Sequence, residues 1–412
     1  MKPDSKNSTI FNVAVLVASL GYFVDIYDLL LFTIVRVPSL KSLGVPQDEI
    51  DKGIGVWLMN IQMIGLLLGG IMWGIIADKR GRLRVLFGSI LLYSVANIAN
   101  GFVQTTTAYS FWRFVAGVGL AGELGAGITL VAEILPKEKR GYGTMIVATV
   151  GVSGAIAANL IAKLVPDWRY CYFIGGGLGL VLLLLRISVM ESGMFHAAAT
   201  DNSVKRGNIF ALINNRERFI KYLKCIMLGT PTWFVVGVLI AYSNKFAVEM
   251  GVKDPIAPGD AIAFCYAGLV LGDFVTGWVS QLWKSRRKVM ILFLLLTIVF
   301  TAVYLHQSGT SQTFFFTICF LLGFSVGFWA IFVTIAAESF GTNLRATVAI
   351  TVPNFARGML VLITILFGWL QHSFSYLTSA GIVGLITIGL GLLASYLVPE
   401  TFGKDLNYME TI

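Results

Sequence analysis

Charged side chains lie inside long apolar stretches of this sequence, where they could bind and release protons or exchange ion-pair partners. They are four carboxylates and two arginines, namely Asp25, Asp28, Glu123, Asp273, Arg113 and Arg357. A charge in the middle of a membrane costs at least about 2.5–3.5 kcal/mol, so such residues are functional candidates by default. If each arginine neutralises one carboxylate, two carboxylates remain, and burial beside like charges favours their protonated form. We therefore expect this group of residues to exchange protons.

Position along the predicted helices indicates which of these charges are able to meet. Asp25 and Asp28 are three residues apart and share one helix face. Counted at about 1.5 Å per residue, Asp28 reaches the depth of Arg113, and Asp273 reaches that of Arg357. The expected proton carriers are Asp25, Asp28 or Glu123. Arg113 is expected to displace the proton by forming the alternative salt bridge, and a static polar network that only fixes helix packing is the competing hypothesis.

A second set of residues is able to line a binding site, since small-molecule sites place a few polar groups among aromatic side chains. The candidates are Tyr22, Tyr27, Trp233, Asp273, Trp329, Asn354 and Arg357. Arg357 suits a carboxylate, whereas Asp273 suits an amine or hydroxyl groups. This pair fits an organic acid or an amino-acid-like metabolite better than a neutral sugar, unless the two residues only satisfy each other.

The composition identifies lipid as the surroundings of these residues. Hydrophobic residues make up 56% of the 412 residues and charged residues only 13%, which is too little polar surface for a water-soluble fold of this size. Apolar runs of about 20 residues are long enough to cross a membrane. Twelve such runs lie near 11–36, 53–77, 85–103, 108–135, 143–164, 170–189, 222–244, 261–282, 289–305, 312–339, 347–370 and 375–398. We predict an all-α membrane protein whose first run is a spanning helix and not a cleaved leader.

One glycine-rich stretch, "GVGLAGELGAG", matches the G-x-G-x-x-G spacing of a dinucleotide-binding turn at Gly117, Gly119 and Gly122. That fingerprint binds phosphate only where a helix begins, because the ligand needs free backbone N–H groups. Here the apolar run from Tyr109 to Leu135 continues through the glycines. We interpret the small residues as close helix contacts and expect no nucleotide or other cofactor. The sequence contains no metal-spaced His/Cys cluster and no Ser/His/Asp grouping, so neither a metal nor an enzyme activity is expected.

An internal repeat divides the chain into two halves. "GLLLGGIMWGIIAD" from Gly65 aligns with "GLVLGDFVTGWVSQ" from Gly268, and "VAEILPKEKRG" from Val131 aligns with "AAESFGTNLRA" from Ala336. Between the halves lies the one long polar stretch of the sequence. We predict an N-terminal six-helix bundle, a cytoplasmic linker and a C-terminal six-helix bundle at 1–189, 190–221 and 222–412. Two parallel halves are typical of rocking-bundle transporters, whose substrate site lies between the halves.

The stretch "GIIADKRGRLR" carries a resemblance to a known family. Its residues Gly74, Asp78, Lys79, Gly81 and Arg82 fit the loop pattern G-x-x-x-D-[RK]-x-G-[RK]-[RK] of the major facilitator superfamily, from which the next residue, a leucine, departs. The chain resembles that superfamily over essentially its whole length. "RFVAGVGLAGELGAG", "EILPKEKRG" and "LVPETFGKDL" are similar to the metabolite:proton symporters. The sugar porters come second because the predicted helix 222–244 lacks their glutamine pair.

The resemblance implies proton-coupled uptake of a small polar metabolite, such as an organic acid, amino acid or betaine, by alternating access. A proton-driven exporter of amphiphilic compounds and a sugar:proton symporter are the alternatives. Charged residues around the repeated loops are then expected to close a cytoplasmic gate, with Asp78 meeting a helix N-terminus or Arg140. The gate candidates are Gly74, Asp78, Arg82, Glu133, Arg140, Glu338 and Arg345. A solvated loop that only anchors the helices is the competing interpretation.

The basic residues predict how the chain lies in the membrane. Loops rich in Lys and Arg stay cytoplasmic, and most of the 31 Lys and Arg residues fall in cytoplasmic segments if both termini are inside. The net charge of +9 therefore reflects topology, and no nucleic-acid partner is expected. We expect a monomer in a bacterial inner membrane, with both termini cytoplasmic, whose partners are lipid, protons and a small-molecule substrate.

Overall fold

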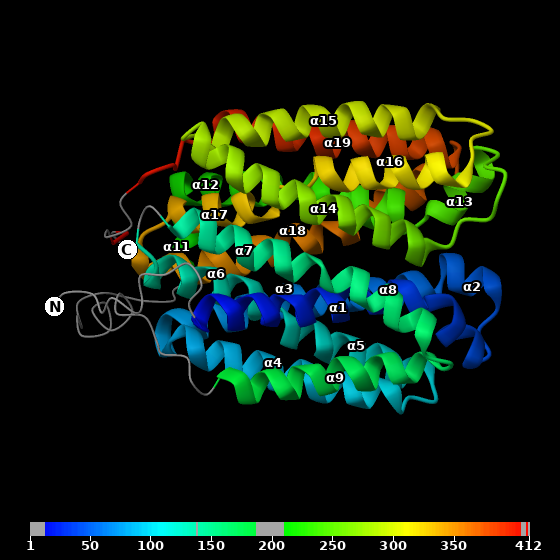
Figure 1. Cartoon of the computed structure of the whole chain (residues 1–412), viewed down its shortest axis with the longest axis horizontal. Coiled ribbons are helices and arrows are strands. Elements are labelled where there is room, and N and C mark those ends of the chain that lie inside the picture. Colours follow the sequence, from blue (N-terminus) through cyan, green and yellow to red (C-terminus); the bar gives the residue numbers. More distant parts are fainter. Residues whose placement is uncertain (1–12, 137–138, 187–209, 405–408, 411–412) are drawn as a thin grey trace.

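The chain folds into helices that lie side by side along one axis in the computed structural model (Figure 1). The structure describes residues 13–136, 139–186, 210–404 and 409–410, and these residues form no strand. Within them, 12 helical spans are long and apolar enough to cross a membrane. The predicted all-α membrane fold and its twelve membrane helices are confirmed.

Six spans come from each half of the chain. The first half contributes α1 (Val13–Ser42), α2 with α3 (Gln47–Lys52 and Ile54–Arg80), α4 (Arg82–Gly101), α5 with α6 (Thr106–Leu120 and Glu123–Ile134), α7 with α8 (Arg140–Val152 and Gly154–Leu164) and α9 (Trp168–Leu185). The second half contributes α12 with the π-helix η3 (Arg216–Phe234 and Val235–Ile240), α14 (Pro258–Leu282), α15 (Arg286–His306), α16 with α17 (Gln312–Ser325 and Trp329–Ser339), α18 (Thr342–Leu370) and α19 (Tyr376–Leu397). The short helices α11 (Phe210–Ile213) and α13 (Ser243–Glu249) complete the described helices.

The two halves form two bundles that meet along the length of the molecule. In Figure 1, α1, α3, α4, α5, α8 and α9 occupy the lower part, and α12, α14, α15, α16 and α19 occupy the upper part. Contacts between α3 and α18 and between α7 and α14 join the halves. The predicted linker, 190–221, is described only from residue 210, where it contains α11 and the start of α12; its remainder lies outside the described residues.

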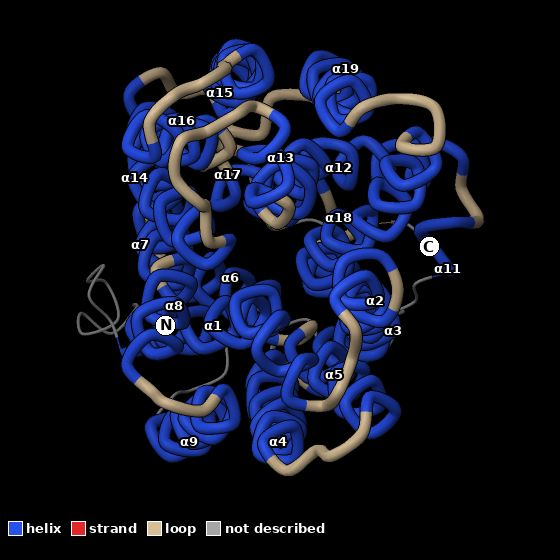
Figure 2. Tube along the Cα trace, turned by 90° about the vertical axis from the view of Figure 1, so that its right-hand side faces the viewer, coloured by secondary structure: helices blue, strands red, loops and turns tan. Residues whose placement is uncertain are grey.

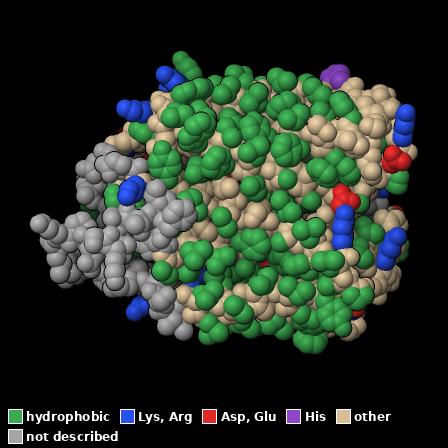
Figure 3. Space-filling view, viewed as in Figure 1, with side chains coloured by type: hydrophobic (Ala, Val, Ile, Leu, Met, Phe, Trp, Pro, Cys, Tyr) green, Lys and Arg blue, Asp and Glu red, His purple; other side chains and the backbone are tan. Residues whose placement is uncertain are grey.

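The surface of the molecule suits a membrane environment. Hydrophobic side chains cover the middle of the face in Figure 3, and most charged side chains visible there lie near the two ends. Figure 2 looks along the helix axes from one end and shows the helices of the two bundles packed side by side. Below, the end at which α1 begins is called the inner end, after its predicted orientation, and the opposite end is the outer end.

Side chains at the helix starts explain where many helices begin. A residue that accepts a backbone N–H in the first turn stabilises a helix by typically about 1 kcal/mol. Such N-caps are Thr105, Asp167, Asn215, Ser285, Ser311 and Ser375. Each is a Ser, Thr, Asn or Asp, which are the residue types that predict a helix start from sequence.

The glycine-rich run is not the one continuous helix that was expected, because α5 ends at Leu120 and α6 begins at Glu123, directly after Gly122. Its glycines let the helices approach until backbones touch, as expected. A Cβ atom on Gly117 of α5 would lie 2.2 Å from the carbonyl oxygen of Gln62 on α3. A Cβ atom on Gly125 of α6 would lie 2.4 Å from the carbonyl oxygen of Ala349, which belongs to α18 in the other half. Small residues give membrane helices their close contacts, since lipid offers no hydrophobic drive for association.

Candidate substrate, proton and gate sites

Asp25 and Arg357 form an ion pair that joins the two halves. Asp25 lies near the middle of α1 and Arg357 near the middle of α18, with 3.3 Å between Oδ2 and Nη2. Both side chains are buried, at 0% and 1% exposed. Nη1 of the arginine donates to Oδ1 of Asn354 at 3.3 Å, and the guanidinium lies 5.9 Å from the ring of Trp329. The arginine therefore sits on the interface between the two halves.

The predicted pairing of Arg357 with Asp273 is wrong. Oδ1 of Asp273 instead accepts the backbone N–H of Ala330 at 3.0 Å, in the first turn of α17. Oγ1 of Thr276, one turn along α14, donates to the carbonyl oxygen of Gly327 at 2.8 Å. Both contacts satisfy backbone groups at the break between α16 and α17, where these groups lack helical hydrogen-bond partners. Hydropathy shows that region as one continuous run and gives no signal of the interruption.

Aromatic side chains from both halves surround the ion pair. The rings of Trp233 and Trp329 meet edge to face with 6.2 Å between centroids, and both Nε1 groups are buried without a hydrogen-bond partner among the described residues. Tyr22 and Tyr266 also face the Arg357 guanidinium. The sequence analysis missed Tyr266, because a lone tyrosine in an apolar run looks like a packing residue. Unpaired donors beside a cation give the interface the means to hold an anion with an aromatic body.

Tyr27, the remaining substrate candidate, lies against α9 within the first half. Its hydroxyl donates to the carbonyl oxygen of Cys171 at 2.8 Å. Neighbouring aromatic groups extend the same contact region, with the hydroxyls of Tyr109 and Tyr172 2.7 Å apart. The geometry gives Tyr27 a packing role between α1 and α9.

Glu123 has a fixed cationic partner that the sequence analysis did not count. Nη2 and Nη1 of Arg186 lie 2.6 Å and 3.0 Å from the two Glu123 oxygens, and Ser89 donates to one of them at 2.8 Å. The two charged side chains are each 1% exposed. The prediction of two buried arginines is therefore wrong, because it left out Arg186, which lies within the predicted run 170–189 and directly follows α9. The Glu123 carboxylate has hydrogen-bond partners on both oxygens, so Glu123 is less suited to carrying a proton than Asp25 or Asp28.

The predicted ion pair between Asp28 and Arg113 does not form. Both residues are buried, yet no ion pair within 4.0 Å is found for either side chain in the described part of the chain. Arg113 donates from Nη2 to Oε1 of Gln62, and its guanidinium lies 4.9 Å from the ring of Phe32. Both carboxylate oxygens of Asp28 have no hydrogen-bond partner there. The two charges nevertheless share one buried region and act on each other electrostatically.

Charged contacts at the inner end connect the halves where the gate was expected. Asp78 on α3 accepts the backbone N–H and the hydroxyl of Thr347 on α18, at 2.8 Å and 2.6 Å. Arg82 lies 2.8 Å from Glu133 and 3.7 Å from Asp78, and Arg345 reaches across from α18 to within 3.8 Å of Glu133. The expected contact of Asp78 with Arg140 or a helix N-terminus is wrong, since Thr347 lies inside α18. Gly74 lets α3 and α18 approach, because a Cβ there would lie 3.2 Å from the Thr347 Cα.

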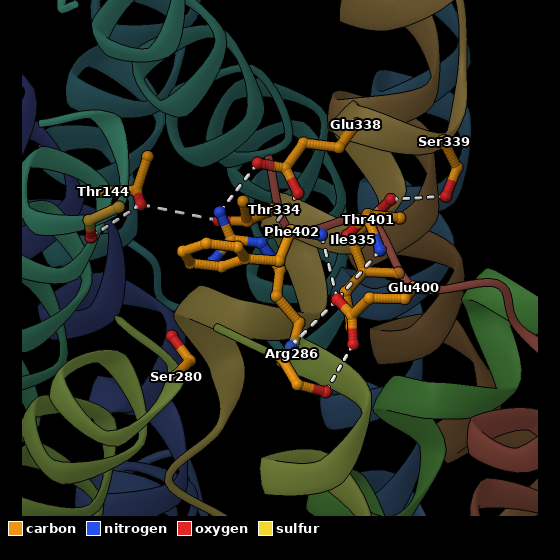
Figure 4. A network of polar contacts seen from close by, with 12 residues as sticks. Thr144, Ser280, Arg286, Thr334, Ile335, Glu338, Ser339, Glu400, Thr401 and Phe402 are labelled. Carbon is orange, nitrogen blue, oxygen red and sulfur yellow. Dashed lines mark hydrogen bonds and ion pairs between the residues drawn. The ribbon is translucent and has the colours of Figure 1, made fainter. Parts of the chain in front are cut away.

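The second half of the chain repeats one of these contacts, the Arg–Glu ion pair. Arg286 forms two contacts of 2.7 Å with Glu338, in the positions that Arg82 and Glu133 take in the first half. Figure 4 shows its guanidinium between Glu338 and the ring of Phe402, 5.6 Å away. Arg140, by contrast, donates to the carbonyl oxygen of Leu135 at its own helix start. The repeat in the sequence contains the signal for Arg286, but the aligned segments end just before it.

Glu400 ties the segment after α19 to the start of α15 (Figure 4). Its carboxylate accepts from the hydroxyl of Ser285 and from the backbone N–H groups of Arg286 and Arg287. Partial burial alone raises the pKa of Glu400, but these hydrogen bonds outweigh it and hold the pKa below its ordinary value. A lowered pKa means that the contact is stable above the usual range and weakens as the pH falls through the lowered value.

A charge substitution tests whether Asp78 closes the inner end. We expect Asp78→Asn to raise the labelling rate of a Thr351→Cys probe on α18 about tenfold, because hydrogen bonds to a charged acceptor are worth about 1.5–3 kcal/mol. The measurement is maleimide labelling of the purified protein, in which the four native cysteines are buried. Glu217→Gln, an exposed charge at the start of α12, is the control. Equal labelling in all three backgrounds contradicts the gate.

Comparison with known proteins identifies the family of this chain. Residues 11–353 match the model described as Major Facilitator Superfamily. The benzoate transport protein of Acinetobacter baylyi is 23% identical over 100% of this chain and 96% of its own length, and the niacin transporter of the same organism is 22% identical over 80% of each. The solved structure of the proton:xylose symporter XylE superposes with a TM-score of 0.75 at 16% identity, covering 96% of this chain and 97% of that one.

In the described part of the chain, twelve spanning helices form two similar bundles with buried charges on the interface between them. Together with the family match and the relatives, they define an integral membrane transporter of metabolites and not an enzyme. The chain belongs to the major facilitator superfamily, as the loop around Asp78 predicted.

Proposed function

We propose that this transporter takes up a small carboxylate metabolite together with a proton, by alternating access between the two halves. The observation that carries the proposal is the buried ion pair between Asp25 and Arg357, which is made by one residue from each half. A buried arginine that already has a carboxylate partner binds a second carboxylate only if the first is neutralised. Protonation of Asp25 is the step that neutralises it.

The charges balance at every stage of such a cycle. With Asp25 ionised, Arg357 is paired and the empty carrier is able to reorient. When a proton binds to an Asp25 oxygen, the guanidinium is released and accepts the substrate carboxylate in a two-pronged contact. Asn354, which accepts from the same guanidinium, stays in place to orient it. Proton and anion then cross together, and loss of the proton inside restores the original pair.

The surroundings of Arg357 favour an aromatic or otherwise planar acid. The ring of Trp329 lies 5.9 Å from the guanidinium and contacts the ring of Trp233, so the two rings supply flat apolar walls. Their Nε1 groups have no hydrogen-bond partner among the described residues. Small-molecule sites combine such walls with a few fixed polar groups. Benzoate, the substrate named for the relative from Acinetobacter baylyi, has this chemistry, and it is the substrate with which we begin.

The structure holds contacts between the halves at both ends of this interface, which supports alternation. At the inner end, Asp78 bonds to Thr347. At the outer end, Lys163 and Asn159 of α8 contact Asp260 of α14, and Thr364 of α18 lies 3.4 Å from an Asn60 oxygen on α3. Each set has to break for the site to open on its own side.

Orientation and boundaries complete the proposal. We infer that both termini lie in the cytoplasm of a bacterial inner membrane and that a cytoplasmic linker joins the first bundle to the second. Support comes from the basic residues, which concentrate in the loops at the inner end.

Uptake by the purified protein in liposomes tests the function. We expect benzoate to accumulate when the outside is acidic and to leak out when a protonophore is added. Asp25→Asn mimics the protonated state permanently, so it should abolish accumulation while equilibrium counterflow of benzoate continues. Asp48→Asn, an exposed carboxylate in α2, should leave both unchanged.

Other outcomes of the same assay count against carboxylate uptake. Accumulation of xylose without benzoate would indicate a sugar:proton symporter. Extrusion of an amphiphilic dye without benzoate uptake would indicate an exporter. Accumulation that survives in Asp25→Asn would show that the proton is coupled elsewhere.

A further inference from the structure

Buried polar atoms without partners gather in the outer half of the first bundle. They belong to residues that are at most 1% exposed. Among the described residues, no hydrogen-bond partner is found for both side-chain oxygens of Asp28, for the carboxamide oxygens and nitrogens of Asn97 and Asn100, for Oγ of Ser94, or for Nε and Nη1 of Arg113. Buried polar groups are almost always paired with protein or with ordered water, so this concentration calls for an explanation.

The geometry arranges these groups in a line from the outer end towards Asp28. Asn97 and Asn100 are three residues apart and share one face of α4. Asn100 is next to Gly101, the last residue of that helix at the outer end. Asn97, one turn deeper, lies beside the Asp28 carboxylate. Asp28 in turn lies against the bare backbone of α9, since a Cβ on Gly175 would be 2.4 Å from its Oδ1.

We propose that water molecules fill this line and deliver the proton from the outside to Asp28, by a route separate from that of the substrate. The inference rests on the proposed proton coupling and names its path. Each unpaired buried group carries a desolvation cost that a bound water removes, and a chain of such waters transfers protons between neighbours. The substrate route runs between the halves, whereas this line runs inside the first half, between α1, α4, α5 and α9.

The proton has a short way from Asp28 to the substrate site. Asp25 is three residues away on the same helix face, a rise of about 4.5 Å along the axis. A water at the end of the line gives its proton to an Asp28 oxygen and takes a replacement from the water behind it. The proton then passes to Asp25, which releases Arg357 for the substrate carboxylate.

The other charged and titratable groups around Asp28 fit this role. They come from all four helices, namely Asp25 and Tyr27 on α1, Tyr93 on α4, Arg113 on α5 and Tyr172 on α9. Arg113 is the cation among them, and it has no carboxylate partner within 4.0 Å in the described ranges. Its charge compensates Asp28 after the proton has moved on. A fixed ion pair between the two would instead block proton binding.

Apolar replacements of the two asparagines test the route. Asn97→Leu and Asn100→Leu keep the side-chain size and remove the hydrogen bonds. We expect both to slow benzoate uptake driven by an acidic outside about tenfold, while equilibrium counterflow of benzoate stays within about twofold of wild type. Asn97→Ser, which keeps a polar group, should recover most of the pH-driven rate. Val95→Ala, on the lipid-facing side of α4, is the control.

The outcomes separate the route from the proposed function. If both leucine variants take up benzoate at the wild-type rate while Asp28→Asn does not, the route is wrong and proton coupling stands. If Asp28→Asn also accumulates benzoate normally, Asp28 carries no proton and both fall. If Asn97→Ser loses uptake and counterflow together with Asn97→Leu, the asparagine only supports packing, which also overturns the route.

Discussion

Arg357→Gln should lose benzoate uptake and benzoate counterflow together. Removing one partner of a buried charge pair costs about 2–5 kcal/mol, so we expect binding to weaken about a hundredfold. The substrate loses its cation, and Asp25 is left as a buried charge without a partner. Arg357→Lys keeps the charge but not the planar fork, and should fall between the two. Titration of benzoate into the purified protein and counterflow in liposomes measure the effect.

The contrast with Asp25→Asn makes this prediction specific. That variant should keep counterflow and lose accumulation, whereas Arg357→Gln should lose both. Arg216→Gln, an exposed arginine at the start of α12, serves as the control for the loss of an arginine. Wild-type benzoate affinity in Arg357→Gln would mean that the carboxylate binds at another cation.

Arg186→Met should destabilise the first bundle more than any loop substitution. It leaves Glu123 buried as an unpaired carboxylate, which costs about 3–5 kcal/mol. Arg186 also packs directly against the backbone of α1 at Gly21, where a Cβ atom would lie 2.0 Å from its Nη2. We expect a clear fall in the melting temperature of the protein in detergent, with loss of the folded fraction at 37 °C.

The double variant Arg186→Met with Glu123→Leu separates stability from coupling. Replacing a whole buried ion pair by apolar groups is often nearly neutral, so the melting temperature should largely recover. If the recovered protein still accumulates benzoate from an acidic outside, Glu123 is not the proton carrier. If it exchanges benzoate but no longer accumulates it, Glu123 carries the proton, which contradicts our assignment to Asp25 and Asp28.

The fold could be predicted from sequence because lipid imposes a strict rule on length. Each run of about 20 apolar residues has to become a spanning helix, since no other structure satisfies its backbone in hydrocarbon. The repeat from Gly65 and Gly268 then showed two similar halves. Both signals depend on residue type and spacing along the chain, which a sequence contains in full.

The partners of the buried charges could not be predicted in the same way. Counting residues gives the height of a side chain in the membrane but not the direction in which it points around the helix axis. Asp28 and Arg113 share a height, yet each faces other groups. Asp25 and Arg357 are 332 residues apart, and only the docking of the halves brings them together. Asp273 was misassigned because the interruption before α17 has no signature in hydropathy.

The contact of Gly125 with Ala349 has a consequence for the speed of the transport cycle. Main chain contacts main chain there without an intervening side chain, so we expect one half to turn against the other at this point without unpacking side chains. Such a contact adds little to the energy barrier of that movement. We therefore expect the barrier to come mainly from the contacts at the two ends. A Gly125→Ala substitution should raise it, because the added methyl group would push the two helices apart.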